Sequence, residues 1–128
     1  MLDNKSKFFN NNISVVYELV FQKDSEEIVV IKGAIPKALK LQFKIICVKK
    51  DLEMSEVLDN LIREWIQADA PLTKLSLDCL NEETEDVKTY VPKSLKHEFK
   101  LICIQKRVTI RSILYLLIKQ WVNMEYPY

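Results

Sequence analysis

An internal repeat with a period of 56 residues constrains this chain more than any other feature of its sequence. Residues 31–40 and 87–96 each contain a short alternating run, a proline and a basic segment. The match continues downstream without an insertion, and a fixed period of this kind indicates two copies of one supersecondary unit. The recurring residues are Lys37, Leu39, Lys40, Phe43, Lys44, Ile46, Cys47, Lys50, Leu58, Leu61, Ile62, Trp65 and Pro71, with Lys93, Leu95, Lys96, Phe99, Lys100, Ile102, Cys103, Lys106, Leu114, Leu117, Ile118, Trp121 and Pro127.

The size of the repeat predicts that the two copies fold together. A unit of this length is close to the size below which a chain struggles to bury enough surface alone. The whole chain has 128 residues, of which 48% are hydrophobic. We therefore expect one compact domain, or two very small units that share a core.

Each copy is predicted to be a strand followed by two helices. The strands are expected at 29–35 and 87–91, where a proline ends each alternating run and suits the start of a helix. A helix is predicted over 37–49, because Leu39, Phe43 and Cys47 fall on one helical face. A second helix follows a short polar turn in each copy. Thr109 is the expected N-cap of the later one. For the earlier one, Glu53 is a poorer candidate, and Asp51 or Ser55 is the alternative.

The chain is divided by these elements into four parts. Residues 1–27 are read as a polar arm and an extra N-terminal strand, the strand covering 13–21, which carries β-branched and aromatic residues. The first unit covers 28–68, a linker 69–84, and the second unit 85–128. A leading strand in the second copy, at 72–77, is a weaker match.

Composition excludes several functional classes. The single glycine rules out a glycine-rich phosphate loop, and no set of residues suited to catalysis is present, so we expect no enzyme, no cofactor and no metal site. The three cysteines lack CxxC spacing, which fits a reducing compartment. Cys47 and Cys103 are predicted core residues, Cys79 a free thiol, and His97 a residue on the outer side of its helix.

The unit resembles the ribbon-helix-helix family of DNA-binding regulators of the MetJ/Arc/CopG type. The residues that carry the likeness are the repeated Lys-x-x-Ile/Val-Pro-Lys-x-Leu pattern and 54–58 at the start of the second helix. The resemblance covers roughly 29–67 and 85–123. It implies a mainly α fold with a short β-ribbon, in which the tandem units form an intramolecular pseudo-dimer. In that family an antiparallel ribbon enters the major groove of DNA.

The resemblance and the alternation of the strands together define a candidate site. Ile31, Ile35, Val87 and Val91 are expected to face the helices. The base-contacting residues are then expected to be Val30, Lys32, Ala34, Asp86, Lys88 and Tyr90. The phosphate-contacting residues are expected around the turn and the start of the second helix, and they are Lys50, Ser55, Lys106, Arg107, Arg111 and Ser112. Because the two copies differ at the outward positions, a site that is not a perfect palindrome is predicted.

The predicted function is sequence-specific binding of double-stranded DNA by a transcriptional regulator, such as a repressor. A net charge of +1 argues against binding through bulk charge, so the proposed contacts are local. Self-association of pseudo-dimers on DNA is also expected. Without a long apolar run or a signal-peptide pattern, we expect no membrane contact and a cytoplasmic location in a prokaryotic cell, or for a protein of its virus or plasmid. The alternative is a protein-interaction module, such as an antitoxin or a plasmid-partition accessory protein. For Lys40, Lys44, Lys96 and Lys100, DNA contact and an ordinary solvated face remain equally open.

Overall fold

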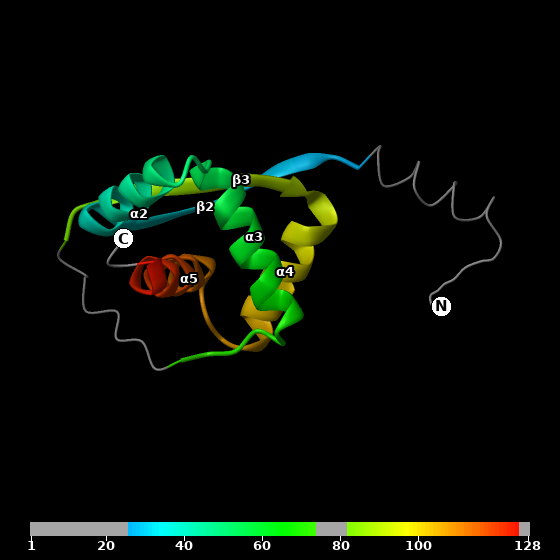
Figure 1. The fold of residues 1–128 in the computed structure, drawn as a ribbon. Coiled ribbons are helices and arrows are strands. Elements are labelled where there is room, and N and C mark those ends of the chain that lie inside the picture. The colour runs from blue at the N-terminus through cyan, green and yellow to red at the C-terminus, as the bar shows by residue number, and fades with distance from the viewer. Residues whose placement is uncertain (1–25, 74–81, 126–128) are drawn as a thin grey trace.

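The computed structural model describes residues 26–73 and 82–125. Within these ranges the protein is mainly helical, with four helices and a two-stranded antiparallel sheet. Figure 1 shows the two long strands side by side, with helices around them. The elements, in chain order, are β2 (Ile28–Pro36), α2 (Lys37–Lys49), α3 (Met54–Gln67), β3 (Thr84–Pro92), α4 (Lys93–Gln105) and α5 (Ile110–Glu125). The mainly α fold with a short ribbon is therefore confirmed.

The two strands pair with each other along their whole length. Ile28 lies opposite Pro92, and Pro36 lies opposite Thr84. Both strands are longer than predicted, and β3 begins three residues earlier, at Thr84. The backbone N–H of Lys37 donates to the Glu83 carbonyl at 2.9 Å, so the pairing extends past the ends of the strands.

The inner face of the ribbon is apolar, as the alternation predicted. Ile31, Ile35, Val87 and Val91 are all buried. Thr89 is also buried, and its hydroxyl donates to the Ser55 carbonyl at 2.8 Å. Because a buried hydroxyl without a partner would be costly, this hydrogen bond allows a polar residue on the apolar inner face of the ribbon.

The first helix of each unit ends in the same way. After α2, Asp51 has a φ of 57°, and after α4 the equivalent Arg107 has a φ of 59°. The N–H of Leu52 donates to the Cys47 carbonyl, and that of Val108 donates to the Cys103 carbonyl. These are the bonds of a Schellman motif, which satisfies the last carbonyls of a helix and turns the chain sharply.

The second helices begin differently. Thr109 caps α5, because its hydroxyl accepts the Ser112 N–H at 3.0 Å while its own N–H donates to the Ser112 hydroxyl at 3.2 Å. This confirms the predicted cap. At α3 the N-cap is Glu53, which makes no side-chain capping bond. Of the three candidates, Glu53 therefore takes the position, and the alternatives were wrong, because Asp51 belongs to the Schellman turn and Ser55 is already inside the helix.

One core lies between the ribbon and the helices, and both halves of the chain contribute to it. Trp65 of α3 packs edge-on against Phe99 of α4, with ring centroids 5.7 Å apart. Trp121 of α5 packs in the same way against Phe43 of α2, at 5.4 Å. Such pairs contribute about 0.5–1.5 kcal/mol beyond the area that they bury. Each tryptophan therefore packs on the other half of the chain.

Some predictions lie outside the described residues. These are the arm and strand within 1–25, most of the linker with Cys79, and Pro127 at the end of the second unit. In the described ranges, no helix is both long enough and apolar enough to cross a membrane.

Candidate nucleic-acid interface

The six residues predicted to face outward lie together on the outer side of the ribbon. Lys32, Asp86, Lys88 and Tyr90 are exposed, whereas Val30 and Ala34 are half-buried. The register places them in three facing pairs, Val30 with Tyr90, Lys32 with Lys88, and Ala34 with Asp86. A strip of side chains from two strands thus stands on the face away from the helices.

The two lysines at the centre of the strip face each other across the ribbon. Like charges directly opposite each other on an antiparallel pair destabilise it. Each lysine has a weak partner on its own face: the Lys32 Nζ lies 3.9 Å from a carboxylate oxygen of Asp86, and the Lys88 Nζ lies 5.9 Å from the centre of the Tyr90 ring. Both contacts are exposed and therefore weak. The pair concentrates positive charge at the middle of the ribbon.

The two ends of the strip differ in chemistry. One end carries Val30 and Tyr90, and the other carries Ala34 and Asp86. An aromatic ring and a β-branched side chain favour apolar contact, whereas a carboxylate accepts hydrogen bonds. A ligand that lies along this face would meet a different set of groups at each end.

The start of α5 lies against the edge of the ribbon. The Arg111 Nε donates to the Ala34 carbonyl at 3.0 Å, which leaves the rest of its guanidinium available to another acceptor. The first turn of α5 contains no acidic residue, and Arg107 lies exposed in the preceding turn. The Ser112 hydroxyl is occupied by the cap, because it donates to the Thr109 carbonyl at 2.8 Å.

The start of α3 is the equivalent place in the first unit, but its charge is different. Ser55 occupies the position of Arg111, and Glu53 and Glu56 lie at the N-cap and in the first turn. Carboxylates suit the positive end of a helix dipole, but they repel a phosphate. Of the two helix starts, that of α5 is therefore the better place for an anion.

Two of the predicted phosphate contacts point toward other partners. The Lys50 Nζ lies 2.8 Å from a carboxylate oxygen of Glu125, at the end of α5. The Lys106 Nζ donates to the Asp69 carbonyl at 3.4 Å, just after the end of α3. Both lysines are exposed. Their ammonium groups join the turn of one half of the chain to the helix end of the other.

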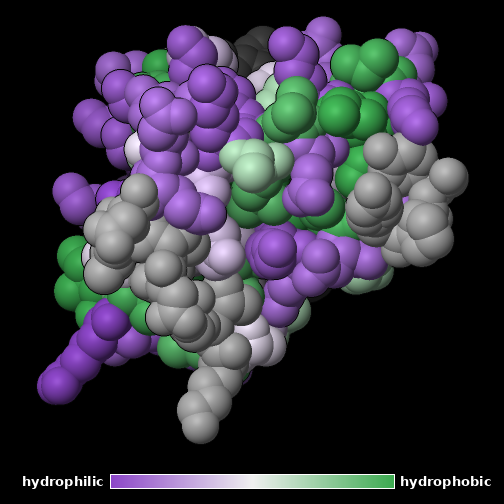
Figure 2. Space-filling model, turned by 90° about the vertical axis from the view of Figure 1, so that its left-hand side faces the viewer, coloured by the Kyte–Doolittle hydropathy of each residue, from purple (hydrophilic) through white to green (hydrophobic). Residues whose placement is uncertain are grey.

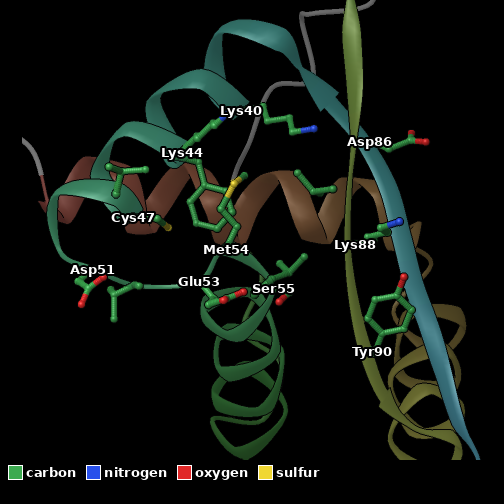
Figure 3. Close-up of a pocket in the computed structure, with 15 residues that line it drawn as sticks. Lys40, Lys44, Cys47, Asp51, Glu53, Met54, Ser55, Asp86, Lys88 and Tyr90 are labelled. Carbon is green, nitrogen blue, oxygen red and sulfur yellow. The ribbon is translucent and has the colours of Figure 1, made fainter.

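A groove beside the ribbon was not found from the sequence. It lies between α2, the start of α3 and the strand β3, and it has a volume of about 580 Å³ (Figure 3). Its lysines and carboxylates come from three separate stretches, 40–44, 51–55 and 86–90. Only the tertiary fold brings these stretches together. The helical spacing of Lys40 and Lys44 was the one signal that sequence analysis could have used.

The thiols are part of the core. Cys47 and Cys103 are free and buried. Burial raises the pKa of both thiols, that of Cys103 to about 11, because an apolar environment disfavours the thiolate. Among the described residues, no group of three or more histidine, cysteine, aspartate or glutamate side chains is placed to hold a metal ion.

The comparisons with known proteins found no match. No protein-family model matches the chain, and no curated protein or solved structure matched it either.

Proposed function

We propose that this chain is a sequence-specific DNA-binding regulator in which two ribbon-helix-helix units form a pseudo-dimer. The observation that carries the proposal is the register of the ribbon. Lys32 lies opposite Lys88, and these residues are separated by the period of the repeat, 56 positions. In a twofold pairing of equivalent strands, a residue at the axis faces its own equivalent. The pseudo-twofold axis would then pass between the two lysines.

Other contacts support the same axis. The N–H of Lys37 bonds to the Glu83 carbonyl, and that of the equivalent Lys93 bonds to the Glu27 carbonyl, both at 2.9 Å. Trp65 packs on Phe99 of the other unit, and the equivalent Trp121 packs on Phe43, which is equivalent to Phe99. Lys50 contacts Glu125, and Lys106 contacts Asp69, the residue equivalent to Glu125. Contacts that recur after exchange of the units are what a twofold arrangement requires.

In the proposed mechanism, the outer face of the ribbon enters the major groove, which is wide enough for two strands. Lys32 and Lys88 donate to guanine O6 and N7 at the centre of the site. Ala34 is suited to a thymine methyl, and Asp86 to the N4 amino group of cytosine. The half-buried Val30 and the exposed Tyr90 meet the other half of the site. The two half-sites would therefore differ in sequence.

Contacts to the DNA backbone are proposed to be stronger on one side. Arg111 and Arg107 stand near the start of α5, where free N–H groups and the helix dipole favour a phosphate. Glu53 and Glu56 weaken the equivalent contact at α3. Contacts of this kind position a protein without reading sequence, so the α5 side would set the orientation of the chain on an asymmetric site.

Self-association is supported by an exposed apolar stripe on the outer side of α2. Its residues recur at helical spacing, and they are Leu41, Ile45 and Val48, with Leu52 also exposed in the turn that follows the helix. Val48 is 70% exposed, and the equivalent Ile104 of α4 is 64% exposed. Figure 2 shows apolar side chains gathered beside strongly polar ones on the side of the molecule where α2 lies. Neighbouring pseudo-dimers on DNA could bury such stripes against each other.

The test of DNA binding is selection of bound duplexes from a random pool, followed by salt titration of the enriched sequence. We expect an enriched, non-palindromic site and an affinity that falls steeply with salt. Absence of enrichment, together with weak dependence on salt, would contradict the proposal and favour the protein-interaction module.

The ribbon is tested by substituting its central lysines one at a time. Lys32→Ala and Lys88→Ala are each expected to weaken binding by about 1–3 kcal/mol, with different effects on the two half-sites. Lys119→Ala, in the middle of α5, is the control and is expected to change binding little. If both ribbon variants lost the same affinity on every permutation of the half-sites, the proposed asymmetric reading would be wrong.

A further inference from the structure

The groove between α2 and β3 is a cavity that DNA binding by the ribbon does not require. We call it the α2–β3 groove. Its floor is formed by Phe43, Cys47, Leu58 and Val87, all of which belong to the buried core. Its volume of about 580 Å³ lies within the range of pockets for small ligands, roughly 300–1,000 Å³.

The two repeats differ at the edge of the ribbon beside the groove. In an antiparallel pair, every second residue turns its carbonyl away from the partner strand. Ala34 does so in β2, and Arg111 donates to its carbonyl. In β3 the equivalent residue is Tyr90, and the residue equivalent to Arg111 is Ser55. A serine side chain is much shorter than an arginine, so the edge of β3 is left accessible from the groove.

The groove is lined by charges of both signs. Figure 3 shows Lys40 and Lys44 on α2 at one end and Asp51 and Glu53 in the turn at the other end, with Asp86 and Lys88 on β3 across from α2. Lys40 and Lys44 are four residues apart on one helix, a spacing at which like charges repel. The Lys40 Nζ lies 3.8 Å from a carboxylate oxygen of Glu85. Lys44 makes no ion pair with any residue in the described ranges.

We propose that the α2–β3 groove binds a small amphipathic anion. Its negatively charged head, a carboxylate, sulfonate or phosphate, lies at the ammonium groups of Lys40 and Lys44. Its apolar body lies along Val48 and Leu52, the exposed apolar side chains of the lining. Each part offsets a cost of the empty groove, since the head relieves the repulsion between the two lysines and the body removes apolar surface from water.

Binding in the groove is expected to affect the ribbon. Lys88 and Tyr90 line the groove and also belong to the outer face of the ribbon. A ligand that changes their position changes the affinity for DNA, and by linkage DNA changes the affinity for the ligand by the same factor. This second step rests on the proposed function, whereas binding of the anion does not.

The probe for the test is decanoate below its micellar concentration, titrated into the full chain without DNA and followed by calorimetry. The matched probes are 1-decanol, which lacks the charge, and decyltrimethylammonium, which reverses it. We expect one decanoate per chain and an affinity at least about tenfold above that of either matched probe. Equal binding of all three probes, or no binding of decanoate, would overturn the proposal.

The chain itself offers the variant that closes the groove. Ser55→Arg introduces the residue that the second repeat has at the equivalent position, and it is expected to weaken decanoate binding about tenfold or more. Lys44→Ala is expected to reduce the preference of decanoate over 1-decanol, and Lys100→Ala, at the equivalent position of α4, serves as its control. Circular dichroism establishes that each variant is folded. Unchanged decanoate binding in folded Ser55→Arg would place the ligand elsewhere and refute the assignment.

Two further measurements distinguish a free anion from a phospholipid surface, and binding in the groove from the proposed DNA binding. Binding to vesicles of an anionic phospholipid without binding of monomeric decanoate would overturn the groove site in favour of a membrane surface. The affinity of the selected duplex is then measured with and without saturating decanoate. A change in that affinity, lost in Ser55→Arg, supports the coupling, and an unchanged affinity refutes the coupling alone. If decanoate binds but no duplex is selected, only the proposed function fails.

Discussion

Replacement of Gly33 by alanine is expected to destabilise the fold, although a glycine in a strand is normally improved by this change. Gly33 lies on the inner face of β2, against the start of α5. A Cβ atom at this position would lie 2.9 Å from Leu114 Cδ1 and 3.4 Å from Arg111 Cα. Leu114 is fully buried, so its side chain has little room to move.

The magnitude follows from two opposing terms. A glycine-to-alanine change stabilises by about 0.4–1 kcal/mol when the new side chain fits, because it restricts the unfolded chain. An extra methyl in a filled core costs about 1–3 kcal/mol. The net loss is therefore about 1 kcal/mol, or a fall of about 4 °C or somewhat more in the melting temperature. Denaturant unfolding measures the free energy directly.

The partner of the clash can be identified by a double-mutant cycle with Leu114→Ala. This substitution removes Cδ1, so Gly33→Ala is expected to cost less in the Leu114→Ala background than in the parent. Thr89→Ala is the matched control, because Thr89 is equivalent to Gly33 and its hydroxyl bonds to Ser55. It is expected to lose about 1–2 kcal/mol through that hydrogen bond and not through crowding. A Gly33→Ala variant as stable as the parent, or strictly additive losses in the cycle, would refute the reasoning.

Three further predictions concern stability. Trp65→Ala should destabilise the fold by about 3–5 kcal/mol, since the ring packs on Phe99 and its Nε1 donates to the Pro71 carbonyl at 2.9 Å; a loss below 1 kcal/mol in urea unfolding would contradict the packing. Thr109→Ala should lower the free energy of unfolding by about 0.5–2 kcal/mol, which is detectable as a lower melting temperature and as faster amide hydrogen exchange at the start of α5. Burial raises the pKa of Cys103 from 9.0 to about 11, so its contribution is complete below pH 9.0 and is lost as the pH rises through about 11. Denaturant unfolding across that range should show a decrease that is smaller in Cys103→Ala, and an equal decrease in both proteins would contradict this origin.

Much of the fold could be predicted from the sequence because the determining signals are local or repeated. A proline at the end of an alternating run defines both the end of a strand and the start of a helix, and the helix α2 has the predicted bounds, Lys37–Lys49. The inward residues of the ribbon follow from alternation alone. The cap at Thr109 follows from the chemistry of a side chain beside free N–H groups. At α3 the same reasoning was wrong for Asp51, because this residue belongs to the turn that ends α2.

The candidate site could likewise be predicted only in part. That six residues share the outer face of the ribbon follows from the period of two. The exposure of four of them could be anticipated from the sequence, but the half-burial of Val30 and Ala34 could not. Their pairing across the ribbon could not, because the register is determined by how two strands and four helices close around one core. The direction of Lys50 and Lys106 toward helix ends in the other half depends on the same closure.

The sequence by itself determined the repeat, the order of strands and helices in each unit, and the faces that those elements bury, because these depend on residues close together in the chain. Only the tertiary structure decided that Lys32 faces Lys88, that the start of α5 packs closely on Gly33, and that Ser55 lines a groove whereas the equivalent Arg111 bonds to the ribbon. These features depend on distances between side chains from distant segments. The two copies of the sequence repeat acquire different surfaces because residues at equivalent positions differ in length and charge.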